Sequence, residues 1–166
     1  MEVSLLDPQT VNIKVYEKGM LGYIYISAIG ENAYFDKDGF VIETSVNVVS
    51  DTPKVTGLSC SEVVLYEKLP LEDESVLRYL LNLTQTLKKY EIEPKEIAFK
   101  EKEGAIVYYN DIRVLIGKEE NLSQKIIRLS HILPKLEGMC GTLHLENWTE
   151  ENTDIVFDKE ENTENP

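Results

Sequence analysis

The sequence is poor in the residues from which most catalytic and metal-binding sites are built. Its 166 residues include two histidines, two cysteines and one tryptophan. His131 and His144 lie far apart, and neither has a nearby cysteine or patterned acid to activate. The motifs of serine hydrolases, zinc peptidases and phosphate-binding loops are absent from the sequence. We therefore expect a protein that is not an enzyme and that needs no cofactor or metal ion.

Basic residues are also scarce. The chain has 17 lysines and arginines against 30 acidic residues, a formal net charge of -13. Nucleic-acid binding requires a basic surface that releases counterions, so this class of partner is excluded. Binding to an anionic membrane surface is disfavoured for the same reason. The acidity is explained by solubility alone, or by a partner of opposite charge.

Cys60 and Cys140 show neither the spacing of a CxxC pair nor that of a zinc site. They could form one disulfide in an oxidising compartment, or both could be small buried residues. No apolar run approaches the roughly 18 residues that a membrane span needs. The N-terminus lacks the features of a signal peptide. Taken alone, the chain resembles a cytoplasmic protein; the alternative is a soluble piece cut from an anchored parent.

The first third of the sequence predicts strands. Residues 11–17 alternate apolar and polar side chains, and residues 21–29 are rich in Tyr and Ile. Residues 36–39 (Asp-Lys-Asp-Gly) form a typical hairpin turn, in which Asp bonds its own backbone and Gly supplies a positive φ. A further strand is expected to approach Pro53 and run into residues 55–58, and a short one is expected at residues 63–66.

The rest of the sequence predicts two helices separated and followed by strands. Apolar residues recur at helical spacing over residues 73–90, where Asp73 or Ser75 can cap the start. A second apolar stripe covers residues 122–136, with Asn121 as a candidate cap, and Pro134 should kink or shorten its last turn. Strands are expected at 96–100, 105–109, 112–116, 141–146 and 154–158. This order predicts an α+β fold, a mixed or antiparallel sheet with two principal helices packed on it.

Five segments, in order, resemble a known family. They are Val-Asn-Ile-Lys-Val-Tyr-Glu-Lys at 11–18, Ala-Tyr-Phe-Asp-Lys-Asp-Gly at 33–39, Pro-Lys-Val-Thr-Gly-Leu at 53–58, Ile-Arg-Val-Leu-Ile-Gly at 112–117 followed by Lys125, and Gly-Thr-Leu-His-Leu at 141–145. Together they are similar to the extracytoplasmic part of the FtsQ/DivIB cell-division proteins. His144 and Glu146 depart from the Asp and Arg of the last family motif.

The resemblance implies how the chain is organised. Residues 1–20 would be the end of a POTRA-like segment and residues 21–158 the FtsQ/DivIB-like β domain, while composition predicts an acidic, disordered tail at 159–166. The parent protein would be a single-pass membrane protein whose N-terminal helix is absent from this chain. This domain would then lie on the extracytoplasmic side of the cell membrane at the division septum.

The resemblance also implies a function, that of a non-enzymatic divisome scaffold. Its partners would be bitopic septal proteins of the FtsL and FtsB/DivIC type, bound by strand addition at a C-terminal sheet edge. By position, the partner-binding surface would comprise Thr142, Leu143, His144, Leu145, Trp148, Ile155, Val156 and Phe157. Which terminal strand is the free edge stays open, as does whether Trp148 belongs to the core or anchors a partner.

Two other functions compete with this interpretation. A secreted or surface enzyme of unknown reaction would require a deep pocket holding two or more titratable groups within hydrogen-bond reach. A POTRA-linked module of an assembly or secretion system would require further POTRA units upstream and a β-barrel downstream.

Overall fold

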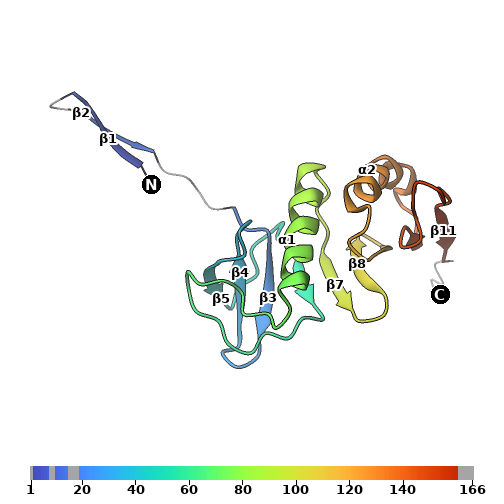
Figure 1. The fold of residues 1–166 in the computed structure, drawn as a ribbon, viewed down its shortest axis with the longest axis horizontal. Coiled ribbons are helices and arrows are strands. Elements are labelled where there is room, and N and C mark those ends of the chain that lie inside the picture. Colours follow the sequence, from blue (N-terminus) through green and yellow to red (C-terminus); the bar gives the residue numbers. More distant parts are fainter. Residues whose placement is uncertain (1, 8–9, 15–18, 161–166) are drawn as a thin grey trace, which may run out of the picture.

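A computed structural model of the chain describes residues 2–7, 10–14 and 19–160. In these ranges β1 (Glu2–Asp7) and β2 (Thr10–Lys14) form a two-stranded sheet. The other strands form a nine-stranded sheet in the order β11-β10-β9-β8-β7-β6-β3-β4-β5 (Figure 1). Their bounds are β3 (Gly22–Ile26), β4 (Glu31–Phe35), β5 (Val41–Ser45), β6 (Lys54–Thr56), β7 (Glu96–Lys100), β8 (Gly104–Tyr109), β9 (Ile112–Gly117), β10 (Gly141–His144) and β11 (Val156–Lys159).

The large sheet is mixed. β6 runs parallel to both β3 and β7, and β10 runs parallel to β9, while the remaining neighbours pair antiparallel. Helix α1 (Glu74–Lys89) connects β6 to β7, and helix α2 (Leu122–Ile132) with the 3₁₀ turn η1 (Leu133–Leu136) connects β9 to β10. The prediction of an α+β fold with a mixed sheet and two principal helices is confirmed.

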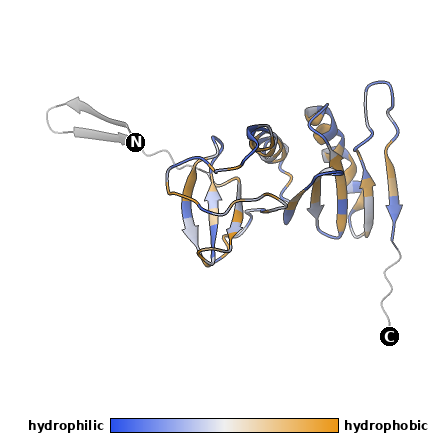
Figure 2. Cartoon of the chain, turned by 60° about the horizontal axis from the view of Figure 1, so that its bottom comes forward, coloured by the Kyte–Doolittle hydropathy of each residue, from blue (hydrophilic) through white to orange (hydrophobic). Residues whose placement is uncertain are grey.

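Both helices cover the same face of the sheet (Figure 2). The two crossover units β6-α1-β7 and β9-α2-β10 start from strands that run in the same direction, and both step toward β11. Because crossover connections are right-handed almost without exception, equal direction and equal step place the helices on one face. The other face of the large sheet carries no helix from the described residues.

Two hydrophobic clusters lie between the sheet and the helices. One joins β7 to β10 with α2 and includes Leu83 and Leu87 of α1. The other joins β3 to β6 and includes Leu80 of α1. Helix α1 thus contributes to both clusters, and it links the two halves of the sheet.

Local signals at the ends of α1 agree with its sequence. The side chain of Asp73 accepts a hydrogen bond from the backbone N–H of Ser75 at 2.8 Å, which confirms the predicted cap. At the other end, the N–H of Ile92 donates to the carbonyl of Leu87, and that of Glu91 to Lys88. This is a Schellman motif, in which Glu91 occupies the left-handed position that is usually glycine.

Helix α2 departs from its prediction at one end. Asn121 has a left-handed conformation (φ 57°), and its side chain makes no capping bond, so the predicted cap is wrong. The predicted shortening at Pro134 is confirmed, because α2 ends at Ile132 and a 3₁₀ turn follows.

The predicted hairpin turn is confirmed. The Asp36 carboxylate accepts hydrogen bonds from the N–H groups of Asp38 and Phe40, each at 3.0 Å, and Gly39 has φ 82°. The strand predicted at 63–66 is not formed. Instead, the backbone of Tyr66 and Glu67 bonds to Val41 and so covers the start of β5.

The N-terminal and C-terminal predictions are tested only in part. Residues 11–14 of the strand predicted at 11–17 lie in β2, paired to β1, which the sequence pattern did not predict. Residues 15–17 lie outside the described ranges. At the other end, Lys159 was assigned to the tail but lies in β11, and residues 161–166 are outside the described ranges.

Candidate functional site

Strand β11 forms one edge of the large sheet. Of the strands in the described ranges it pairs only with β10, in the antiparallel register Leu143↔Phe157, whereas β10 lies between β9 and β11. Of the two C-terminal strands, β11 is therefore the one whose outer side has no neighbour among the described residues. The predicted residues Thr142, Leu143, His144 and Leu145 lie on or directly after the interior strand.

The backbone of β11 alternates between bonding inward and pointing outward. The N–H of Glu160 donates to the carbonyl of Cys140 at 2.9 Å, and the N–H groups of Gly141 and Leu145 donate toward β9. In an antiparallel ladder every second residue faces the same neighbour. The inward residues of β11 are therefore Val156 and Asp158, and the N–H and C=O groups of Phe157 and Lys159 face outward.

Most side chains of the predicted partner-binding surface are packed in the hydrophobic core. Leu143 and Leu145 are fully buried, and Ile155 and Phe157 are partly buried against the cluster under α2. Val156 is 52% exposed on the opposite face. These terminal segments therefore offer a partner mainly their backbone, because the larger apolar side chains are already packed.

Trp148 belongs to the core. Its side chain is only 2% exposed, and the guanidinium of Arg128 on α2 stacks on the indole at 3.9 Å from the ring centroid. The placement of Trp148 on a partner-binding surface is therefore wrong, because a buried ring cannot anchor a second protein. The indole N–H has no hydrogen-bond partner among the described residues.

A cluster of titratable side chains joins β10 to β11 on the face without helices. His144 Nδ1 lies 2.9 Å from Glu146 Oε1, and His144 Nε2 lies 3.2 Å from Asp158 Oδ2. The hydrogen bond to Glu146 raises the pKa of His144 above its usual value, and Asp158 adds to the shift. The second oxygen of Glu146 is buried without a partner among the described residues. Protonated His144 therefore joins two carboxylates across the last strand pair.

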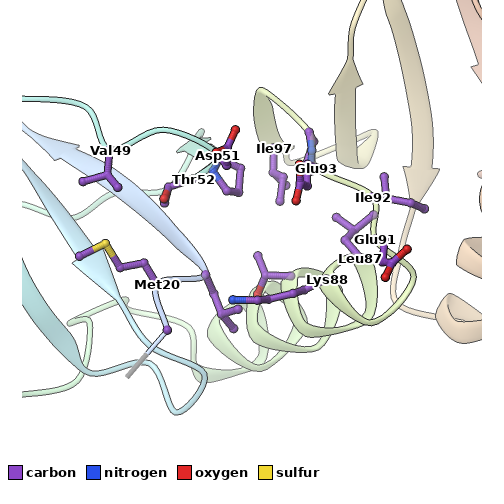
Figure 3. Close-up of a pocket in the computed structure, with 15 residues that line it drawn as sticks. Met20, Val49, Asp51, Thr52, Leu87, Lys88, Glu91, Ile92, Glu93 and Ile97 are labelled. Carbon is purple, nitrogen blue, oxygen red and sulfur yellow. The ribbon is translucent and has the colours of Figure 1, made fainter. Parts of the chain in front are cut away.

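The structure contains a second feature that sequence reasoning missed. A hollow of about 540 Å³ lies between the chain entering β3, the loop before β6 and the C-terminal end of α1 (Figure 3). Its charged lining residues are Asp51, Lys88, Glu91 and Glu93. They are spread over more than forty positions of an acidic sequence, so no spacing pattern could have identified them.

Other candidates from the sequence take no part in either site. Cys60 and Cys140 are free thiols of intermediate exposure, and burial raises the pKa of Cys60. His131 is exposed on α2. In the described ranges no three His, Cys, Asp or Glu side chains are grouped as metal ligands. No described helix has the length and apolar character needed to cross a bilayer.

Comparison with known proteins gives no assignment. No protein-family model matches the chain, and no curated protein matches it. The similarity to the FtsQ/DivIB family therefore stays a prediction from the five short segments named above.

Proposed function

We propose that this chain is a protein-binding domain of a cell-division scaffold, which acts without catalysis on the extracytoplasmic side of the membrane. Its partners are bitopic septal proteins of the FtsL and FtsB/DivIC type. The observation that supports the binding mode is the position of β11 as the last strand of the sheet. A segment of the partner adds to its outer side as a further strand.

The backbone supplies the attachment points. Phe157 and Lys159 each direct an N–H and a C=O outward, as the alternation along β11 requires. Each hydrogen bond contributes only about 0.5–1.5 kcal/mol net. Backbone pairing on so short a strand gives modest affinity, so side chains next to the edge must supply specificity.

The charge around the edge favours a basic partner. The connection before β11 carries Glu150, Glu151 and Asp154, and Asp158 on β11 is 70% exposed at its side chain. A partner strand flanked by lysine or arginine is attracted to this end of the sheet. The net charge of -13 on the chain adds to that attraction. Its association rate then falls as salt is added.

A proline substitution tests the edge directly. Lys159→Pro removes one outward N–H and no bond to β10, while Lys159→Ala keeps that N–H and removes only the lysine side chain. We expect Lys159→Pro to weaken binding of a soluble FtsL- or FtsB/DivIC-type segment by about twofold to tenfold in titration calorimetry. We expect Lys159→Ala to bind like the original chain, or more tightly if Lys159 repels a basic partner.

Asp158→Pro is the contrasting variant. It removes an inward N–H and should detach β11 from β10, which circular dichroism and amide exchange report as local unfolding. Equal affinity of Lys159→Pro and Lys159→Ala for the partner segment would contradict strand addition at β11. Absence of binding by the unmodified domain would contradict the proposed function itself.

A further inference from the structure

The hollow at the C-terminal end of α1 has the size of a ligand site. Its volume of about 540 Å³ lies within the range of roughly 300–1,000 Å³ that is usual for such pockets. Three segments far apart in the sequence meet there, namely residues 19–21, 49–53 and the chain from Thr84 to Ile97. Figure 3 shows Thr52, Asp51, Ile97 and Glu93 next to one another on the sheet side of the hollow, with Lys88 of α1 opposite them.

The floor of the hollow is apolar. Leu21, Leu87, Ile92 and Ile97 line it, and each is at least nine-tenths buried in the core of the domain. They lie just before β3, at and after the end of α1, and in β7. Their positions are fixed because they pack against one another's elements in the core. An aliphatic chain of a few methylenes that lay on this floor would lose contact with water. This burial would favour binding by about 25 cal/mol per Å² of apolar surface removed from water.

The rim of the hollow is negatively charged. Asp51, Glu91 and Glu93 carry three negative charges against the single positive charge of Lys88. Among the described residues no cation lies within ion-pair distance of the three carboxylates. The side chain of Lys88 points along α1 toward the segment that enters β3 (Figure 3). Its Nζ lies close to Gly19, because a Cβ added to that glycine would be 3.2 Å from it.

Two of the rim carboxylates are held by left-handed backbone. Asp51 has φ 60° and Glu91 has φ 55°. Glu91 occupies the Schellman position at which glycine avoids the steric cost of a Cβ. A glutamate there is less favourable for stability than glycine, and strained positions of this kind are concentrated at binding sites.

We propose that this hollow binds a basic side chain of a partner polypeptide, with arginine as the best fit. The aliphatic stem lies on the apolar floor, and the guanidinium bonds to the carboxylates of the rim. Arginine suits the site because its planar head presents five donors, and it loses less hydration than an ammonium group when it is partly buried. This site is separate from the edge of β11, and it does not depend on strand addition there.

Short peptides provide the test. The probe is N-acetyl-Ala-Arg-Ala-amide, and the matched control replaces arginine by citrulline, which has nearly the same shape without the charge. We expect the arginine peptide, at millimolar concentration, to shift the amide NMR signals of Gly19, Thr52 and Ile92 in a saturable way. The citrulline peptide should bind at least about threefold more weakly, in line with the small energies of exposed ion pairs.

Two substitutions locate the binding without disturbing the fold. Glu91→Gly and Asp51→Asn remove carboxylates at positions where the new residues accept a positive φ. Together they should lower the affinity for the arginine peptide by about threefold to tenfold. Glu101→Gln, in the exposed turn before β8, should leave the affinity for this peptide unchanged. Equal binding of both peptides, signals that shift elsewhere on the domain, or no binding at millimolar peptide would each overturn the proposal. Because the readout uses no division protein, failure of the strand-addition experiment leaves this test intact.

Discussion

The imidazole of His144 on β10 reaches diagonally across the last strand pair and lies 3.2 Å from the carboxylate of Asp158 on β11. In the backbone register His144 is opposite Val156, and Thr142 is opposite Asp158. The contact between His144 and Asp158 therefore joins the two strands in addition to their backbone hydrogen bonds. Glu146 holds the other ring nitrogen at 2.9 Å. The edge strand is therefore attached in part by an imidazole whose pKa is raised by its hydrogen bond to Glu146 and by Asp158.

The first prediction concerns pH. The pKa of His144 is raised in the folded protein, mainly by the hydrogen bond to Glu146. The stabilisation is thus fully present below the unfolded pKa near 6.5 and is lost as pH rises through the higher folded pKa. We expect amides of β11 to exchange faster, after correction for intrinsic rates, as His144 deprotonates. The effect should be about 0.2–1 kcal/mol, because Asp158 is largely exposed.

Two variants separate this effect from other titrations. His144→Gln should abolish the pH dependence in β11, and Asp158→Asn should lower the pKa of His144 measured by NMR. Arg113 on β9, which pairs in register with Thr142, is held by Glu103 at 2.7 Å. Asp154→Asn is the control carboxylate. An unchanged pH profile in His144→Gln would refute the role of this cluster.

The second prediction concerns Gly141, where β11 passes close to β10. A Cβ at this position would lie 2.2 Å from the carbonyl oxygen of Asp158 and 3.0 Å from the ring of Phe157. Gly141→Ala should therefore displace β11 and lower the free energy of unfolding by about 1–3 kcal/mol. Denaturation in urea measures the loss, and amide exchange shows whether it is local to β11.

Gly138→Ala is the matched control for Gly141→Ala. Gly138 also has a positive φ (74°), but a Cβ added there would meet no atom of another residue within 4 Å among the described residues. It should cost only the strain of a left-handed alanine, about 1–2 kcal/mol, and leave protection of β11 unchanged. If both variants loosened β11 equally, close approach at Gly141 would not be the cause.

The third prediction concerns Trp148. Truncating this buried ring to alanine should cost about 3–5 kcal/mol of unfolding free energy, since it leaves a large cavity under α2. Arg128→Gln, which removes the stacked cation and keeps the ring, should cost about 0.5–1 kcal/mol. A Trp148→Ala domain of normal stability would contradict the structural role of this buried ring.

The fourth prediction concerns Glu91. Replacing it by glycine relieves the left-handed backbone at the end of α1 and keeps both Schellman bonds. We expect the free energy of unfolding to rise by up to about 1 kcal/mol, the steric gain being partly offset by the entropy of glycine. Glu93→Gln, next to it on the rim, should leave stability within about 0.5 kcal/mol. A destabilised Glu91→Gly variant would mean that the carboxylate stabilises the fold.

Local features of the fold were predictable from the sequence. The cap at Asp73, the turn at Asp36–Gly39 and the short end of α2 before Pro134 each depend on neighbouring residues. Asn121 shows the limit of this approach, because its side chain favours a cap but its left-handed backbone directs it elsewhere. Residues 63–66 have strand propensity, yet they lie in a turn beside β5.

Long-range features were not predictable. The parallel pairing of β6 with β3 and β7 joins segments thirty to forty residues apart, and no local pattern specifies it. For the same reason the sequence left open which C-terminal strand is the edge. The burial of Trp148 depends on Arg128 and α2, and the acidic rim depends on a loop meeting the end of a helix. Both arise only when the sheet is assembled.

The two edges of the large sheet are not equivalent. At β5 the N–H and C=O of Val41 are already taken by Glu67 and Tyr66, whereas β11 has no neighbour along its outer side among the described residues. For copies of this domain to stack β11 against β5, residues 66–67 would first have to leave their place. The segment at residues 66–67 therefore hinders head-to-tail stacking of β11 on the start of β5, the kind of contact through which copies of one domain grow into filaments.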